Sequence, residues 1–182
     1  MKVIQKYFLA LLPPPEILEK AHAIKLMIKD QFGIKYALKS PPHITLKMPF
    51  SYNEAKETLL EKKLEDFLIA KKPFQVKIDG LGTFGNRVIF LRIEKSPELL
   101  QLQSSLKTFC KRELNLVDEL SDRNYHPHMT VAFKDLKPRS FDEVLAMVKE
   151  QSFQTGFSAA HLNLLKRIDQ KWISHKKVSF GG

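Results

Sequence analysis

The strongest constraint on the fold of this chain is a five-residue phrase that occurs twice. Pro42-His43-Ile44-Thr45-Leu46 returns as Pro127-His128-Met129-Thr130-Val131 in a chain of 182 residues. The two copies start 85 positions apart, at residues 42 and 127. An offset close to half the chain length is typical of an internal duplication. The sequence therefore predicts two similar halves, each carrying one copy of the phrase.

Each copy has the pattern of a β-strand with one polar and one apolar face. Successive side chains of a strand point to opposite sides, so the histidine and the threonine of each copy share a face. The residues expected to point toward a core are Ile44, Leu46, Met129 and Val131. If the two strands lie side by side, two imidazoles and two hydroxyls meet in one cleft. A neutral and a protonated histidine can act as base and acid there, and hydroxyls can donate to phosphate oxygens.

The elements expected after each copy are also alike. Capping-box patterns, Ser51 with Glu54 and Ser140 with Glu143, predict that a helix follows each motif strand. A hairpin is expected after each helix, formed by residues 74–81 with 88–93 and by residues 157–167 with 171–180.

This order predicts an α+β fold with two pseudo-symmetric lobes of mostly antiparallel sheet, outer helices and a central cleft. We expect residues 1–182 to form a single domain made of two intertwined lobes.

Composition limits the kinds of binding partner and the cellular compartment that we expect. Lysine and arginine outnumber acidic residues by 30 to 20, and the net charge of +10 favours phosphorylated or polyanionic partners. Any single lysine, for example Lys20, Lys25 or Lys29, is expected on a solvated helix face. The only cysteine, Cys110, excludes an internal disulfide and is expected to be buried. With no apolar run of ~20 residues and no signal-peptide pattern, we expect a cytoplasmic monomer without a membrane partner.

The duplicated phrase resembles the two-histidine phosphoesterase superfamily, which includes 2′-5′ RNA ligases and RNA 2′,3′-cyclic phosphodiesterases. The hallmark of that family is a pair of His-x-Thr/Ser strands, and His43-Ile44-Thr45 and His128-Met129-Thr130 match it. Residues 82–85, Gly-Thr-Phe-Gly, look like the glycine–phenylalanine turn of the family. The resemblance spans essentially the whole chain and implies a bilobal fold.

The resemblance implies a metal-independent phosphodiesterase that opens 2′,3′-cyclic phosphates. It implies that His43 and His128 are the catalytic acid and base, in either order, and that Thr45 and Thr130 bind the phosphate. No cofactor is implied. Relatives act on RNA ends, nucleoside cyclic phosphates or ADP-ribose cyclic phosphate, and the reverse reaction would give 2′-5′ RNA ligation.

Three further residues are candidates for substrate binding. Lys47 shares a face with the first motif if its strand continues that far, and would then supplement the phosphate site or line its rim. Phe84 and Tyr125 could stack on a base. Trp172 is weighed in the same way, although most aromatic side chains must belong to the core.

Two alternatives remain open from the sequence. A zinc ion held by His43, His126 and His128 is possible in principle, but no carboxylate or cysteine recurs with the motifs. A noncatalytic module that binds nucleotides or RNA is the alternative function. The remaining histidines have no repeat partner and are expected to be structural or on the surface: His22, His161 and His175.

Overall fold

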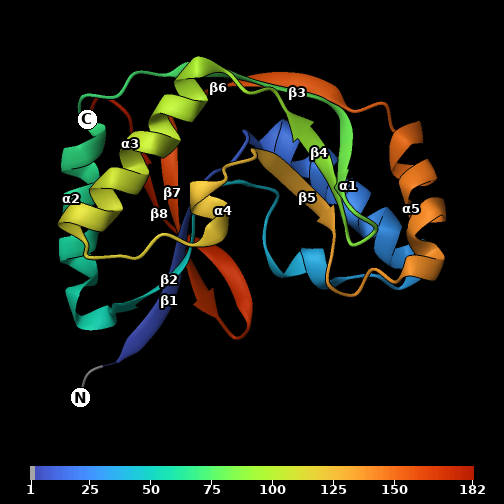
Figure 1. Ribbon diagram of the computed structural model, residues 1–182, viewed down its shortest axis with the longest axis horizontal. Coiled ribbons are helices and arrows are strands. Elements are labelled where there is room, and N and C mark those ends of the chain that lie inside the picture. The colour runs from blue at the N-terminus through green and yellow to red at the C-terminus, as the bar shows by residue number, and fades with distance from the viewer. Residues whose placement is uncertain (1–2) are drawn as a thin grey trace.

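The computed structural model describes residues 3–182 and contains two four-stranded antiparallel sheets (Figure 1). The first sheet has the order β2-β1-β7-β8, and the second has the order β5-β4-β3-β6. The strands of the first are β1 (Ile4–Leu11), β2 (Ile44–Asn53), β7 (His161–Ile168) and β8 (Lys171–Ser179). Those of the second are β3 (Phe74–Phe84), β4 (Val88–Ile93), β5 (His128–Ala132) and β6 (Gln154–Ala159). Each sheet takes strands from both halves of the chain.

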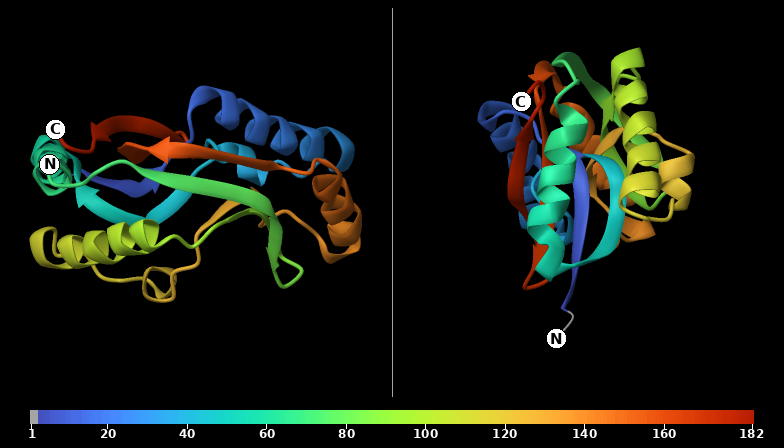
Figure 2. Two further views of the ribbon diagram at one scale, coloured as in Figure 1. Left: turned by 90° about the horizontal axis from the view of Figure 1, so that it is seen from above. Right: turned by 90° about the vertical axis from the view of Figure 1, so that its left-hand side faces the viewer.

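Helices pack against both sheets, so the predicted α+β fold class is confirmed. Figures 1 and 2 show α2 and α3 at the end of the molecule that holds β1 and β2, and α1 and α5 at the other end. Helix α2 contacts β8, α3 contacts β2, α1 contacts β5 and α5 contacts β3. The α-helices are α1 (Pro15–Phe32), α2 (Glu57–Leu68), α3 (Pro97–Glu113), α4 (Leu120–Arg123) and α5 (Pro138–Glu150), with short 3-10 helices η1 (Tyr36–Lys39) and η2 (Glu54–Lys56).

The capping boxes predicted after the motifs are wrong in position. Ser51 pairs with Lys6 within the ladder of β1 and β2, so the strand continues to Asn53 and α2 begins only at Glu57. Ser140 lies inside α5, which begins at Pro138. Strand pairing and a proline at the first helical position override the local capping signal. The two helices themselves follow the motif strands as expected.

The first predicted hairpin is confirmed, and the second needs a correction. β3 and β4 pair as neighbours, as do β7 and β8. Residues 157–159, however, belong to β6 and pair with β3 in the second sheet. The chain changes sheet at Ala160, and the hairpin proper turns at Asp169 and Gln170. Both turn residues have positive φ, 47° and 64°, as a two-residue hairpin turn requires.

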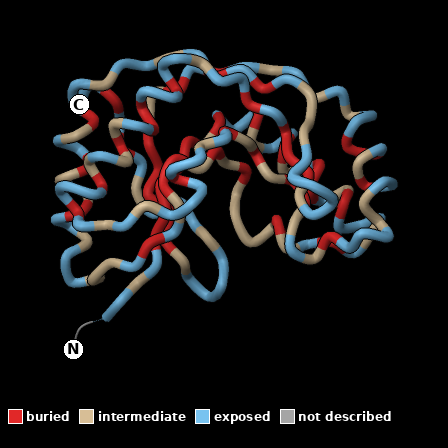
Figure 3. Tube along the Cα trace, viewed as in Figure 1, coloured by how far each residue is buried: buried red, intermediate tan, exposed pale blue. Residues whose placement is uncertain are grey.

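Most buried side chains form one continuous core between the sheets and helices (Figure 3). The four apolar motif residues are at most 1% exposed, as predicted: Ile44, Leu46, Met129 and Val131. Cys110 is fully buried, also as predicted, and burial raises the pKa of its thiol to about 12. Lys25 contradicts the expectation of a solvated lysine, because it is only 2% exposed.

Within residues 3–182, none of the helices has both the length and the hydropathy needed to span a bilayer.

Candidate active site

The two motif strands are edge strands of different sheets. β2 ends the first sheet and β5 ends the second, and the two strands contact one another without forming a ladder among residues 3–182. Thr45 lies opposite Ala10 of β1, and Thr130 lies opposite Phe90 of β4. Successive residues of a strand face opposite ways. Each threonine therefore lies on the face of its sheet away from the buried apolar residues beside it in the motif. The fold thus brings the two motifs to one junction between the sheets.

Both motif histidines are held by the same contact. Nδ1 of His43 lies 2.6 Å from the carbonyl oxygen of Pro41, and Nδ1 of His128 lies 2.6 Å from that of His126. A carbonyl oxygen can only accept a hydrogen bond, so Nδ1 carries a proton in both rings. Nε2 is therefore the atom of each ring that can take up or release a proton.

Aromatic side chains surround the two rings. The ring centroid of His43 lies 4.9 Å from that of Phe8, which in turn packs edge-on against Trp172 at 4.8 Å. His128 lies 5.0 Å from Phe84 and 5.2 Å from Phe90. These environments favour uncharged rings.

Burial therefore shifts both imidazoles in the same direction. It lowers the pKa of His43 to about 4, with smaller contributions from the charges of Lys25 and His128. Burial also lowers the pKa of His128 below its usual value of 6.5, and His126 adds to this effect.

A pocket of about 290 Å³ lies beside the second motif. Its lining includes the motif residues Thr45 and His128 together with the predicted aromatic candidates Phe84 and Tyr125. The hydroxyl of Tyr125 is buried without a hydrogen-bond partner among residues 3–182. The other lining residues are Leu46, Met48, Leu120, Ser121, Asp122, Asn124 and His126. A pocket of this size is near the lower limit for small-molecule sites.

The remaining predicted residues lie outside this lining. His43 and Thr130 are partly buried but do not line the pocket, and Trp172 packs against Phe8 on the side of His43. The residue that sequence reasoning missed is Asp122. It lies in α4, a single helical turn within a segment that carries no strong periodic pattern.

Lys47 is directed into the protein, away from the shared face that the sequence predicted. A β-bulge separates the pairs Ala10 with Thr45 and Leu9 with Lys47, which leaves Leu46 without a partner and reverses the alternation. Lys47 is 1% exposed, and its ammonium forms a short ion pair with Asp122. The ion pair links the first motif strand to the segment that precedes the second motif.

Asp122 completes this link through three further hydrogen bonds. Its carboxylate accepts the backbone N–H groups of Met48 and Glu119, both at 2.9 Å. Its backbone oxygen accepts the side-chain amide of Gln103 at 3.0 Å. Lys47 also donates to the backbone oxygen of Val117 at 2.7 Å. These contacts fix α4, which forms one wall of the pocket, against β2 and α3.

A cluster of cations and aromatic rings lies where η1 meets the segment after β5. The ammonium of Lys134 donates to the hydroxyl of Tyr36 at 3.0 Å, and Lys39 lies 4.8 Å from the centre of the same ring. The hydrogen bond from Lys134 lowers the pKa of Tyr36, with further contributions from Lys39 and Arg167. Phe133 packs edge-on against Tyr36. This cationic cluster consists of Lys39 and Lys134 around Tyr36.

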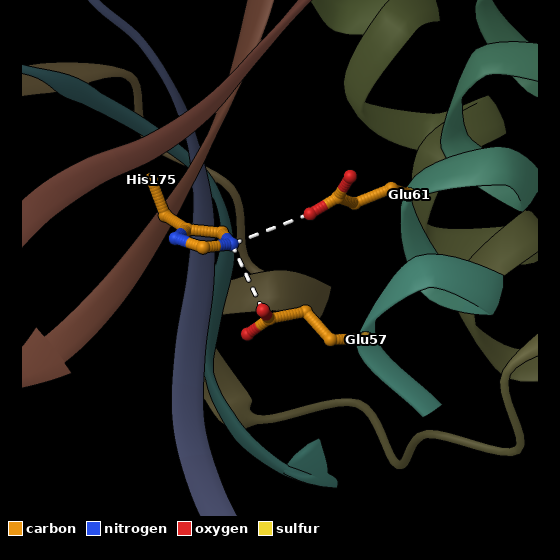
Figure 4. Close-up of side chains that lie close together, drawn as sticks. All are labelled: Glu57, Glu61 and His175. Carbon is orange, nitrogen blue, oxygen red and sulfur yellow. Dashed lines mark ion pairs between the residues drawn. The ribbon is translucent and has the colours of Figure 1, made fainter. Parts of the chain in front are cut away.

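Among residues 3–182, one group of three side chains is close enough to share a metal ion, and it differs from the histidines considered in the sequence. Nε2 of His175 lies 3.0 Å from Glu57 and 3.3 Å from Glu61 (Figure 4). The hydroxyl of Tyr7 in β1 donates a hydrogen bond to Glu57 of this group, whereas Phe8, the next residue of β1, contacts His43. Consecutive strand residues face opposite ways, so this group lies across β1 from His43.

Lysines already neutralise the carboxylates of this group. Lys166 lies 2.7 Å from Glu57, and Lys176 lies 3.6 Å from Glu61. We interpret the group as an ion-pair network that joins α2 to the first sheet.

Known proteins are similar to this chain in sequence over nearly their whole length. Residues 13–171 match the family model described as the 2'-5' RNA ligase superfamily. A protein of Bacillus cytotoxicus, provisionally named a phosphoesterase, is 28% identical over 181 residues, covering 97% of both chains. A protein of Oceanobacillus iheyensis with the same provisional name is also 28% identical over 181 residues, covering 97% of this chain and 98% of the relative.

Solved structures show a similar fold at lower sequence identity. A protein of Thermus thermophilus superposes with a TM-score of 0.67 at 17% identity, covering 97% of this chain and 98% of that one. The crystal structure of E. coli LigT complexed with 3'-AMP superposes with a TM-score of 0.64 at 18% identity, covering 99% of this chain and all of that one.

Proposed function

The chain belongs to the 2'-5' RNA ligase superfamily, and on this premise we propose that it is a metal-independent phosphodiesterase that opens 2′,3′-cyclic phosphates of RNA ends or nucleotides. The observation that carries the proposal is the matched environment of His43 and His128. Each ring is fixed through Nδ1 by a carbonyl two residues earlier, and each belongs to a motif at the junction of the two sheets. A pair of imidazoles with free Nε2 atoms suits coupled proton transfer.

In the proposed reaction, one histidine accepts a proton from water as the water oxygen attacks phosphorus. The other histidine donates a proton to the ribose oxygen whose bond to phosphorus breaks. The products are a 2′- or 3′-phosphate and a free neighbouring hydroxyl. Thr45 and Thr130 donate hydrogen bonds to the non-bridging oxygens, where negative charge increases in the transition state. Solvent then restores the original protonation of both rings.

The same site would support 2′-5′ ligation. If the 5′-hydroxyl of a second RNA replaces water as the nucleophile, the same two proton transfers form a 2′-5′ phosphodiester. The pocket beside His128 offers Phe84 and Tyr125 to a nucleobase, and stacking on an aromatic ring tolerates any base. The complex of E. coli LigT with 3'-AMP is consistent with a nucleotide in this family of folds.

The decisive test is turnover of nucleoside 2′,3′-cyclic phosphates in the presence of EDTA. We expect turnover by the wild-type protein and a loss of at least about 10²-fold in kcat for His43→Ala and for His128→Ala. His22→Ala, which removes a partly buried histidine on α1, serves as the matched control and should retain activity.

The other outcomes of this experiment identify the alternatives. Binding of 3'-AMP by a wild-type protein that turns over no cyclic phosphate would favour a noncatalytic nucleotide or RNA-binding module. Turnover that EDTA abolishes and zinc restores would favour a metal enzyme. Equal activity of the two histidine variants and the wild type would contradict the proposed chemistry altogether.

A further inference from the structure

Arg92 is the charged residue of β4, and the proposed reaction leaves it unused. It lies directly opposite His128 in the ladder between β4 and β5. Directly opposed side chains of an antiparallel pair lie on the same face of the sheet. The neighbours of Arg92 in sequence, Leu91 and Ile93, are buried in the core, whereas Arg92 itself is exposed. A permanent cation therefore lies on the face of the second sheet that carries the second motif.

A β-bulge in the next strand fixes the side chain of Arg92. The ladder between β3 and β4 shifts its register between Ile78 and Leu81, so that Asp79 and Gly80 together lie opposite Arg92. The backbone oxygen of Asp79 accepts the Nε–H of Arg92 at 2.9 Å. Bulges change the direction of side chains and are common next to active sites. Here the bulge directs the arginine across β3.

Gly80 provides the space that the guanidinium occupies. Its φ of 73° lies in the left-handed region that favours glycine. A Cβ atom at this position would lie 3.3 Å from Nη2 of Arg92 and 3.9 Å from its Cζ. The N–H of Gly80 donates to the backbone oxygen of Phe153 at 3.0 Å, which holds the bulge from its other side. The guanidinium therefore rests against the backbone of β3 in a defined orientation.

The guanidinium keeps hydrogen-bond donors for a ligand. Arginine has five N–H donors, and among residues 3–182 the backbone of Asp79 is the acceptor that Arg92 contacts. No carboxylate in that part of the chain forms an ion pair with Arg92, since the nearby Glu94 pairs with Lys77 at 3.5 Å. A planar guanidinium that the protein has already oriented suits a phosphate, which it binds through two parallel hydrogen bonds.

The strand order β5-β4-β3 separates this group from the second motif (Figure 1). Adjacent strands lie about 4.8 Å apart. A side chain that starts on β4 and rests on β3 therefore lies one to two strand spacings, about 5–10 Å, from β5. Arg92 thus lies beside the reacting phosphate expected at the motifs, on the same face of the sheet.

We propose that Arg92 is a specificity-determining residue, which binds the phosphodiester on the 5′ side of the terminal nucleotide of an RNA whose cyclic phosphate reacts at the two motifs. This inference rests on the proposed cyclic-phosphate hydrolysis and adds a second phosphate site to it. No bond changes at this site, so its contribution goes to binding and raises kcat/KM through a lower KM. A mononucleotide lacks the second phosphate and does not benefit from Arg92.

A neutral replacement of one linkage isolates this contact. Two dinucleotides that end in a 2′,3′-cyclic phosphate are compared, one with an internal phosphodiester and one with an uncharged methylphosphonate in its place. We expect the wild-type protein to prefer the phosphodiester by about 5-fold in kcat/KM, and Arg92→Gln to lose this preference. Arg92→Lys keeps the charge without the planar group and should keep part of the preference. Arg112→Gln, which removes an exposed arginine from the last turn of α3, should keep all of it.

Three results would overturn the proposal. Equal activity of the wild type on the two dinucleotides would show that the internal phosphate is not bound. A preference that persists unchanged in Arg92→Gln would place the second phosphate elsewhere. An equal loss of activity on both substrates in Arg92→Gln would assign the arginine to the fold or to the reacting phosphate.

A binding measurement makes the test independent of turnover. The dinucleotide 3′-phosphates that correspond to the two substrates bind without reacting, and the wild-type protein should bind the phosphodiester form more tightly, whereas Arg92→Gln should not. If the wild type hydrolyses neither cyclic phosphate, the proposed function is rejected and these affinities decide on Arg92. Equal affinities of the wild type for the two forms would reject the second phosphate site itself.

Discussion

At the scale of single residues, the two His-x-Thr copies share the same local geometry. Each ring is oriented by the backbone two residues upstream, and each threonine lies on the face of its sheet away from the core. The sequence predicted which face the threonines take, because the alternation of a strand is a local property, but it did not predict the carbonyl contacts of the two rings. It could not predict how far the pKa of each ring is lowered, since the largest cause is burial of the ring, which depends on tertiary packing.

The threonine hydroxyls should matter more in the transition state than in binding. Thr45→Val and Thr130→Val keep the strand shape and remove one donor each, so we expect kcat to fall by about 10²-fold with a small change in KM. Thr155→Val is the matched control, because Thr155 is partly buried in β6, at the opposite edge of the second sheet from β5. Equal kcat values for the two motif variants and this control would exclude the threonines from catalysis.

The pH profile follows from the direction of the two histidine shifts. One ring must be neutral and the other protonated, so activity rises through one of the two lowered pKa values, about 4 for His43, and falls through the other, whichever ring is the base. We therefore expect kcat/KM to be greatest on the acidic side of pH 6.5, the usual value for histidine. In kcat, bound phosphate should raise both values and move the profile to higher pH. A kcat/KM optimum above pH 8 would contradict the lowered pKa values of the two histidines.

At the scale of elements, the relation between the motifs depends on a buried ion pair. Lys47 of β2 and Asp122 of α4 are 1% and 2% exposed, and they join the first motif strand to the segment that leads to the second. The sequence placed Lys47 on the wrong side because a β-bulge leaves no local signature. It also carried no signal for α4, a single turn whose formation depends on the buried contacts of Asp122.

Removal of one partner should be far more damaging than removal of both. Asp122→Ala leaves the ammonium of Lys47 buried without its counter-ion, and we expect a loss of about 3–5 kcal/mol in the free energy of unfolding. The double variant Lys47→Met with Asp122→Leu should recover the part of that loss that comes from the unpaired charge, although the N–H groups of Met48 and Glu119 still lose their acceptor. Urea denaturation of the single and double variants measures the coupling. Additive losses would show that the two side chains do not stabilise the fold as a pair.

At the scale of the whole molecule, the two copies of the motif lie in different sheets. Each sheet contains strands from both halves of the chain. The offset of the two motifs predicted two similar units, and the observed units β1–α1–β2 and β4–α3–β5 both end in a motif strand. The crossing of β6 into the second sheet was not predictable from pattern, because residues 157–167, which are divided between β6 and β7, read as one strand. Long-range pairing with β3 separates them.

Part of the excess positive charge of this chain, which has a net charge of +10, lies in the cationic cluster around Tyr36. This cluster lies next to the end of β5, where an RNA chain could approach the second motif. For an RNA oligonucleotide that ends in a 2′,3′-cyclic phosphate, we expect log(1/KM) to fall with log salt by about 0.7 per phosphate contacted. Lys134→Ala should reduce that slope by about one contact. Lys72→Ala, an exposed loop lysine, should not, and equal slopes for the two variants would place the RNA elsewhere.

In the proposed mechanism, His43 and His128 act on a single phosphate. A crystal structure with inorganic phosphate or 3'-AMP tests this most directly. We expect one phosphate group at the junction of β2 and β5, within hydrogen-bond distance of Nε2 of both histidines and of the hydroxyls of Thr45 and Thr130. A phosphate bound to one motif alone, or bound only at the cationic cluster, would contradict the mechanism.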